Sequence, residues 1–250
     1  MSTVFLSPSL QESNPYITGN GSEADFMRRL SDAMIPDLLR LGIPFSTTQK
    51  GDTLTDAIGK SNDYRPTLHV ALHSNAAPDA YTGQFQGPEI YYYRQSAGGR
   101  RAAQSIAEYL SQIYPYAGTV QLIPTDDELA ELTRTRAPAV FVEVAYHDNP
   151  QDAAWIEGNI PAIADAIVHG IADYFAVPYA PDASIPVGRV RLSSGTLNVR
   201  SAPSENARVV DSLQNGDFVL VLQKLPGWFF IRTGDGTSGY ASAQYVELLS

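Results

Sequence analysis

The stretch AVFVEVA, residues 139–145, is a near-continuous apolar run that contains one charged residue, Glu143. Such a run is typical of a strand that is buried on both faces of a sheet. Because an unpaired carboxylate is costly to bury, Glu143 needs an explanation. Two explanations are open. The first is structural: the strand lies at a sheet edge, or Glu143 forms an ion pair with Arg134 or Arg136. The second is functional: Glu143 is a general base at the carboxyl end of a strand, where open α/β sheets place their sites.

Strands and helices alternate on both sides of this run. Apolar runs predict strands at residues 3–6, 68–72, 89–93 and 139–145. Helical spacing of apolar residues predicts helices at residues 22–42, 96–113 and 159–175. Ser22 is the expected N-cap of the first helix, and Pro36 is expected to kink it. The alternation indicates an α/β fold with a mostly parallel sheet flanked by helices.

The periodicity changes after a proline-rich stretch. AVPYAPDASIPVG, residues 176–188, lacks a periodic apolar pattern and is typical of an extended linker. The short β-rich runs that follow are separated by Gly, Pro, Asn and Asp, which is typical of a small all-β barrel. We therefore expect an α/β domain at residues 1–176, a linker at 177–187 and an all-β domain at 188–250.

The composition excludes several classes of protein. With 44% hydrophobic and 18% charged residues, the chain can form a core, and no run approaches the about 20 apolar residues that cross a bilayer. No membrane insertion is therefore expected. The absence of cysteine excludes disulfides and thiolate metal ligands. The net charge of −10 argues against a nucleic-acid partner, which would need a basic surface.

Polar residues stand where predicted strands end or a helix begins. His73 follows the strand LHVAL and shares a face with His69, so His73 emerges at the strand end. Glu23 lies in the first turn of a predicted helix, where a carboxylate also complements the helix dipole. His147 has the same strand parity as Glu143, so the two are expected to face the same side. Each residue taken alone also has a plain structural reading, as a capping, surface or turn residue.

Three segments together resemble the zinc amidases of the muramoyl-alanine amidase type 3 family. They are GNGSEADF at residues 19–26, LHSNAAPD at 72–79 and PAVFVEVAYHDNP at 138–150. GPEIYYY at 87–93 and the following helix also match, and the resemblance covers residues 3 to 175. It implies the zinc-amidase fold and a Zn²⁺ cofactor, with Glu23 and His73 as zinc ligands and Glu143 as the catalytic acid–base.

One departure from the family pattern concerns the remaining ligand. The common family form begins with Asp-Pro-Gly-His-Gly-Gly, whose His binds zinc, whereas LSPSLQESNPY at residues 6–16 has no histidine. Catalytic zinc is usually held by three protein ligands, so a replacement is expected. Glu12 is the first choice because it is the only anionic group in the loop, and Gln11 and Asn14 are weaker donors. The alternative is a site that has lost its metal.

Further residues are expected to contact the substrate. His147 would stabilise the oxyanion or contact the peptide stem, and Asn75 and Arg136 would bind substrate. The tail, with LNVRS at residues 197–201 and the pairs Gly227-Trp228 and Gly239-Tyr240, is similar to bacterial SH3 domains. That similarity implies an SH3-like module that binds the cell wall, with Trp228 and Tyr240 as candidate contacts for a wall peptide.

The resemblances imply a peptidoglycan hydrolase that cleaves the amide bond between N-acetylmuramic acid and L-alanine of the stem peptide. Zinc would polarise the amide carbonyl, and Glu143 would move the proton. We expect a monomer whose partner is peptidoglycan. The alternatives are a non-catalytic wall-binding protein that has lost a zinc ligand, and a metallopeptidase that acts on stem peptides.

The site of action implied by these resemblances is the cell wall. The first residues, MSTVFLSPSL, have no basic segment and only a three-residue apolar run, so no secretory signal is expected in this sequence. The protein would then reach the wall as a prophage endolysin does, or after removal of a leader.

Overall fold

The computed structural model describes residues 2–116, 120–126, 128–182 and 184–249. The chain divides into two compact units. The first contains Met1–Met34 and Phe45–Tyr179, and the second contains Ile35–Pro44 and Ala180–Ser250. The second unit therefore includes the end of the first long helix as well as the tail. Independent folding of residues 1–176 stays a prediction.

The first unit is built on a six-stranded sheet with the order β2-β1-β3-β6-β4-β5. Its strands are β1 (Val4–Pro8), β2 (Phe45–Thr47), β3 (Leu68–Asn75), β4 (Glu89–Tyr93), β5 (Gln121–Thr125) and β6 (Ala139–Tyr146). The pairs β1–β2, β1–β3 and β3–β6 are parallel, whereas β4 runs antiparallel to β6. The predicted mostly parallel sheet is confirmed. Because β6 lies inside the sheet, the edge-strand explanation of Glu143 is wrong.

The longer helices of this unit begin at side-chain caps, whereas its four-residue helix has none. The helices are α1 (Glu23–Arg40), α2 (Leu54–Tyr64), α3 (Ala97–Ile113), α4 (Ala130–Thr133) and α5 (Pro150–Tyr174). At the start of α1, the Ser22 hydroxyl accepts a hydrogen bond from the Asp25 N–H at 3.2 Å, and Asp25 accepts from the Ser22 N–H at 3.0 Å. This reciprocal pair is a capping box, so the predicted N-cap is confirmed. Pro36 lies inside α1, which continues past it to Arg40.

Helix α5 begins at Pro150 rather than at Asn159, where the sequence pattern placed its start. The Asn149 side chain accepts backbone hydrogen bonds at the helix start, and a proline suits the first turn because its φ is already helical. Asn159 instead has non-helical backbone angles, φ −128° and ψ 20°, two residues before Pro161. The predicted start is therefore a kink within a longer helix.

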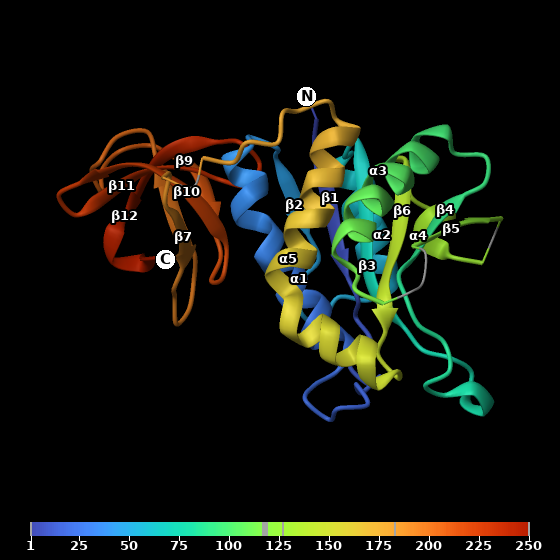
Figure 1. Ribbon diagram of the computed structural model, residues 1–250. Helices are drawn as coiled ribbons and strands as arrows, with labels where there is room; N and C mark the ends of the chain where they lie inside the picture. Colours follow the sequence, from blue (N-terminus) through green and yellow to red (C-terminus); the bar gives the residue numbers. More distant parts are fainter. Residues whose placement is uncertain (1, 117–119, 127, 183, 250) are drawn as a thin grey trace. The chain divides into compact units, whose positions relative to one another are not determined.

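Helices α3 and α5 pack side by side across one face of the sheet (Figure 1). Their axes approach closely at Gly170, where an added Cβ would lie 2.6 Å from the Ile106 Cα. Ile106 on α3, Ile163 and Ile167 on α5 and Val140 on β6 are fully buried, which places the core between these helices and the sheet. Within the described ranges, no helix is long and apolar enough to cross a bilayer.

The strand register brings polar residues of neighbouring strands together. His73 on β3 lies opposite Glu143 on β6, and Glu89 on β4 lies opposite Glu143 from the other side. Ser9 follows β1, and its N–H donates to the carbonyl of Leu72 on β3 at 2.9 Å. Because cross-strand neighbours share a face, Glu89, Glu143 and His73 lie in one row on the same face of the sheet.

The second unit contains a seven-stranded antiparallel sheet with the order β13-β7-β10-β11-β12-β8-β9. The strands are β7 (Val187–Val190), β8 (Leu197–Arg200), β9 (Val209–Leu213), β10 (Phe218–Leu225), β11 (Trp228–Arg232), β12 (Ser238–Ser242) and β13 (Val246–Leu248). Val190, Val199, Val219 and Ile231 are fully buried in its core. The predicted all-β character is confirmed. Strand β7 begins at Val187, the last residue of the predicted linker, and pairs with β10 and β13, and the predicted domain bounds stay a prediction.

Candidate active site

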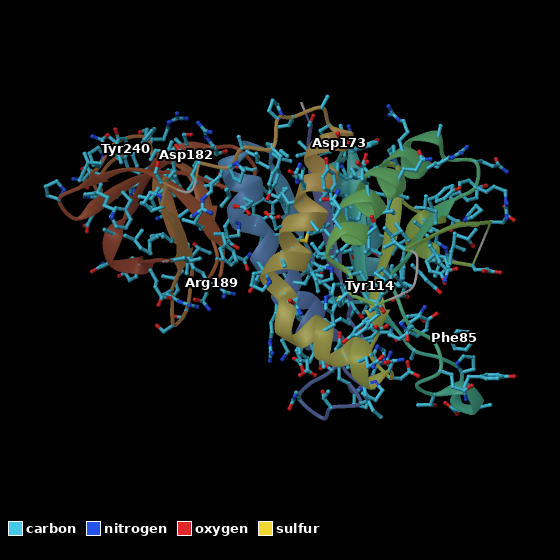
Figure 2. The ribbon with its side chains drawn as sticks, viewed as in Figure 1. Phe85, Tyr114, Asp173, Asp182, Arg189 and Tyr240 are labelled. Carbon is cyan, nitrogen blue, oxygen red and sulfur yellow. The ribbon has the colours of Figure 1, made fainter. Side chains whose placement is uncertain are left out.

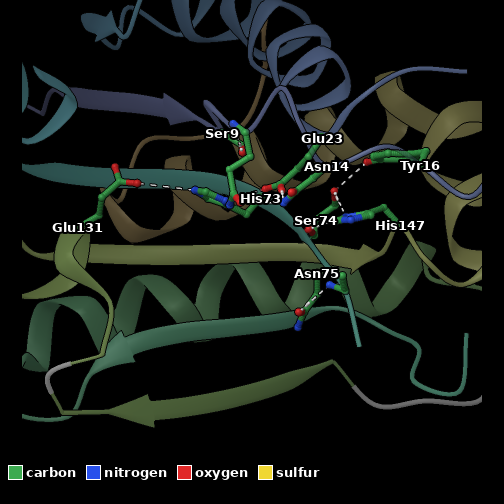
Figure 3. Close-up of polar contacts among 11 residues, drawn as sticks. Ser9, Asn14, Tyr16, Glu23, His73, Ser74, Asn75, Glu131 and His147 are labelled. Atoms are coloured by element: carbon green, nitrogen blue, oxygen red, sulfur yellow. Dashed lines mark hydrogen bonds and ion pairs between the residues drawn. The ribbon is translucent and has the colours of Figure 1, made fainter. Parts of the chain in front are cut away.

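His73 lies between two buried carboxylates. Its Nδ1 is 2.7 Å from Oε1 of Glu23 at the start of α1, and its Nε2 is 3.7 Å from Oε1 of Glu131 on α4. Figure 3 shows the two carboxylates on opposite sides of the ring. The imidazole also stacks on Phe141 with a centroid distance of 4.1 Å. Burial alone lowers the pKa of His73, but the interactions with the carboxylates of Glu131 and Glu23 outweigh burial and raise the pKa to about 10.

Glu23 is held by the loop that precedes it. Its Oε2 accepts a hydrogen bond from Nδ2 of Asn14 at 3.0 Å, and Asn14 also donates to Oε1 of Gln11 at 2.7 Å. The Ser9 hydroxyl bonds to the same carboxylate. Burial raises the pKa of Glu23, but the bonds to His73, Ser9 and Asn14 together hold it below its usual value. The loop at residues 11–14 and the start of α1 therefore come together at the carboxylate of Glu23.

Glu143 has an unsatisfied carboxylate. The residue is partly exposed, yet its Oε2 is shielded from solvent and has no hydrogen-bond partner among the described residues. Burial raises the pKa of Glu143 to about 8, with the charge of His73 opposing this rise and the charges of Glu23 and Glu89 adding to it. A carboxyl group whose pKa lies near neutrality can both take up and release a proton.

A buried relay of three side chains lies behind His73. The relay consists of Ser61, His69 and Glu131. The Ser61 hydroxyl lies 2.9 Å from Nδ1 of His69, and Oε2 of Glu131 lies 2.9 Å from Nε2 of the same ring. Burial raises the pKa of Glu131, but the hydrogen bonds with His69 and His73 outweigh burial and lower the pKa to about 2. Sequence reasoning missed Glu131. Its one available signal is a carboxylate next to the apolar residue Leu132.

His147 contacts Ser74 and Tyr16. Its Nδ1 lies 2.8 Å from the Ser74 carbonyl oxygen and 3.0 Å from the Ser74 hydroxyl, which also accepts from the Tyr16 hydroxyl at 3.0 Å. The His147 ring stacks on Tyr16, and its carbonyl accepts from the Ile17 N–H at 3.0 Å. Because a carbonyl oxygen only accepts hydrogen bonds, Nδ1 of His147 is the ring nitrogen that donates to Ser74.

Glu89 gathers three hydrogen-bond donors from neighbouring strands. Nδ2 of Asn75 donates to it at 3.1 Å, and the hydroxyls of Tyr91 and Tyr146 donate at 2.6 and 2.8 Å. Asn75, which was expected to bind substrate, thus has its amide engaged by Glu89. Sequence reasoning missed Glu89 as a site residue. A carboxylate that opens a tyrosine-rich strand after Gly87-Pro88 was the signal that could have revealed it.

Glu12 and Arg136 lie apart from this cluster. Glu12 is exposed in a turn, where its N–H donates to the Leu10 carbonyl at 3.1 Å. Arg136 is exposed before the start of β6, and its N–H donates to Oδ1 of Asn62 at 2.7 Å. Bends at Arg136 and Ala137 precede β6, and the strand from Ala139 to Glu143 alone spans roughly 13 Å. The structure therefore does not bring Arg136 and Glu143 together, and an ion pair between them is excluded.

Trp228 and Tyr240 belong to the second unit, on neighbouring strands β11 and β12. Tyr240, labelled in Figure 2, lies opposite Phe230 in the register, with ring centroids 5.0 Å apart. Trp228 stands two residues before Phe230 and so shares its face of the strand. These three half-buried rings form an aromatic strip, of which sequence reasoning missed Phe230.

Donor atoms of the kinds that metal ions bind lie together in the cluster on the first sheet. Among the described residues, no group of three or more His, Cys, Asp or Glu side chains is placed to hold a metal ion. Glu23 and His73 supply two donors of the kinds that zinc binds. The unpaired oxygen of Glu143 lies on the strand next to His73.

Comparison with known families gives two matches. The family model described as N-acetylmuramoyl-L-alanine amidase matches residues 4–173, and the model described as bacterial SH3 domain matches residues 195–247. No curated protein sequence matches the chain. The first match covers the sheet with Glu23, His73 and Glu143, and the second covers most of the antiparallel sheet of the tail.

Solved structures of amidases share the fold of the first unit. The N-acetylmuramyl-L-alanine amidase Ami1 from Mycobacterium smegmatis has 24% identity and a TM-score of 0.61, with 70% of this chain and 97% of that chain covered. AmiC2 of Nostoc punctiforme has 19% identity and a TM-score of 0.61, with the same coverage. The catalytic domain of the CD27L endolysin targeting Clostridia difficile has 20% identity and a TM-score of 0.55, with 69% and 98% covered.

Proposed function

Because the chain belongs to the N-acetylmuramoyl-L-alanine amidase family, we propose that Glu23 and His73 hold a zinc ion and that Glu143 is the general acid–base. The protein is a peptidoglycan hydrolase with a bacterial SH3 module, and this assignment replaces the two alternative functions considered from the sequence. The observation that carries the proposed roles is the unpaired, buried oxygen of Glu143 on the strand beside His73.

Glu23 and His73 fit a zinc ion through the chemistry of their donors. A carboxylate oxygen and an imidazole nitrogen are both common zinc ligands. The two atoms are buried and lie 2.7 Å apart, so they share a proton that a cation would replace. When bound, zinc would polarise the amide carbonyl and make the attacking water more acidic.

We propose that the segment Gln11–Asn14 supplies the third ligand. Glu12 is the candidate because it is the only carboxylate there, and its present exposure means that the loop must turn it inward. Ser9 and Asn14 contact the Glu23 carboxylate directly, but their side chains already hydrogen-bond to it and so orient it. The zinc affinity of a Glu12→Gln variant tests whether Glu12 is the third ligand.

The residues around the scissile bond have separate tasks. Glu143 would accept a proton from the attacking water and deliver it to the departing alanine nitrogen. With Nδ1 engaged by Ser74, Nε2 is the nitrogen of His147 that would contact the substrate, either at the oxyanion or at the peptide stem. Asn75 would act through Glu89, whose position opposite Glu143 keeps a second negative charge beside the acid–base.

In the second unit, the aromatic strip of Trp228, Phe230 and Tyr240 is proposed to bind wall peptide. Flat, half-buried rings on one sheet face offer apolar contact area with little loss of side-chain entropy. We propose that the chain acts as a monomer. Light scattering on the purified chain would test the oligomeric state.

Product analysis tests the proposed reaction. Purified peptidoglycan is digested, and mass spectrometry identifies the fragments. We expect free stem peptides with an N-terminal alanine and glycan strands without peptide. Glu143→Gln should reduce the rate by about 10²–10⁴-fold, the usual contribution of general acid–base catalysis. The exposed Glu108 on α3 provides the control, and Glu108→Gln should cleave at the wild-type rate. Cleavage within the stem peptide would contradict the assignment.

A further inference from the structure

We propose that Glu131 is a positioning residue that fixes the ring of His73 and the nitrogen on which it carries its proton, leaving Nδ1 to bind the metal ion. The inference rests on the proposed function, since metal binding by His73 is part of that function. Glu131 lies on α4, a helix of four residues between β5 and β6. None of the sequence motifs assigns it a role.

The two ring nitrogens of His73 face different carboxylates. Nδ1 lies 2.7 Å from Glu23, and Nε2 lies 3.7 Å from Glu131, on the far side of the ring (Figure 3). A carboxylate only accepts hydrogen bonds, so the nitrogen that faces Glu131 is the one that keeps its proton when a metal binds. Metal-binding histidines commonly donate their second N–H to a carboxylate, which sets the tautomer and the ring orientation.

Glu131 is itself held in place from behind. Its Oε2 accepts a hydrogen bond from Nε2 of His69 at 2.9 Å, and Nδ1 of that ring lies 2.9 Å from the Ser61 hydroxyl. A carboxylate only accepts hydrogen bonds, so His69 carries a proton on Nε2 and donates it to Glu131. The three residues are at most 4% exposed, and hydrogen bonds in such a dry interior are strong.

The second oxygen of Glu131 separates a positioning role from a purely structural one. The bond to His69 occupies Oε2, and Oε1 is the atom that faces His73. If Glu131 served only to satisfy His69, its loss would lower the stability of the fold and leave the metal affinity of the folded protein unchanged. If it positions His73, the metal affinity of the folded protein must fall.

The test measures zinc affinity on the full-length chain by competition with a fluorescent chelator. Glu131→Gln removes the charge at nearly constant shape, and Glu131→Asp keeps a carboxylate but withdraws it. Glu128→Gln is the matched control, because Glu128 is exposed and precedes the same helix. We expect Glu131→Gln to bind zinc about ten- to a hundredfold more weakly, Glu131→Asp to fall between, and Glu128→Gln to match the wild type.

Thermal unfolding in a chelator identifies the variants that fold without metal, and affinity is compared among those alone. If Glu131→Gln does not fold, Glu131→Asp carries the test. A zinc affinity within twofold of the wild type in the folded variant overturns the proposal.

Nitrogen-15 spectra of the histidine rings provide a second readout that does not depend on activity. The wild type should show His73 protonated at Nε2 with zinc bound, and Glu131→Gln should show a mixture of ring states. If the wild-type chain binds no zinc, the metal site of the proposed function is wrong. The same spectra without zinc then still test positioning, because an unchanged His73 ring in Glu131→Gln overturns it.

Discussion

Substituting Gly170 by alanine would test the contact between α5 and α3. The new Cβ would lie 2.6 Å from the Cα and 2.8 Å from the backbone nitrogen of Ile106. Because these are backbone atoms, no side-chain rotation relieves the overlap and one helix must move. Overpacking costs about 1–3 kcal/mol, and a backbone clash belongs at the upper end of that range. Alanine returns about 1 kcal/mol through its higher helix propensity, so the free energy of unfolding should fall by about 2 kcal/mol.

Gly158 provides the matched control on the same helix. An added Cβ there meets no atom within 4 Å, so Gly158→Ala should keep or raise stability, by up to about 1 kcal/mol. Thermal unfolding followed by circular dichroism measures both variants. For a unit of this size, Gly170→Ala should lower the melting temperature of the α/β unit by about 4–8 °C. If Gly170→Ala melts with the wild type, the close approach of α3 and α5 is wrong.

Three further predictions concern buried polar groups, the third ligand and the tail. Tyr114 donates to the buried carboxylate of Asp152 at 2.6 Å, so Tyr114→Phe should lower the free energy of unfolding by about 1–3 kcal/mol in urea titrations, and an unchanged midpoint would contradict this. Glu12→Gln should weaken zinc binding at least about tenfold, as expected for loss of a ligand, and full affinity would remove Glu12 from the site. Replacing Trp228 and Tyr240 by alanine should reduce sedimentation with purified walls while soluble muropeptides are still cleaved, and unchanged sedimentation would leave the strip without a binding role.

Local patterns predicted the elements that have strong patterns of their own. The tyrosine-rich run at residues 89–93 is β4, and the apolar run that contains Glu143 is β6. The helix α4 was missed because four residues are too short to show a helical period. Helix α5 was shortened because its first turns are set by the cap Asn149 and not by the apolar spacing.

The same distinction applies to the site. The places of Glu23, His73 and Glu143 in the fold were predictable because a helix start and two apolar strands mark them in the sequence, while their roles stay proposals. Glu131 and Glu89 were not predictable, since their roles depend on partners that the register brings near. His69, for example, stands 62 residues before Glu131 and meets it only because β3 and β6 are neighbours. No local pattern carries that information.

The central claim is that Glu23 and His73 hold zinc while Glu143 moves the proton. The most direct measurement compares zinc content and wall hydrolysis in three purified proteins: the wild type, His73→Ala and Glu143→Gln. The account predicts about one zinc per wild-type chain, loss of both zinc and hydrolysis in His73→Ala, and retained zinc with hydrolysis reduced by about 10²–10⁴-fold in Glu143→Gln. Hydrolysis at the wild-type rate by Glu143→Gln, or undiminished zinc in His73→Ala, would contradict it.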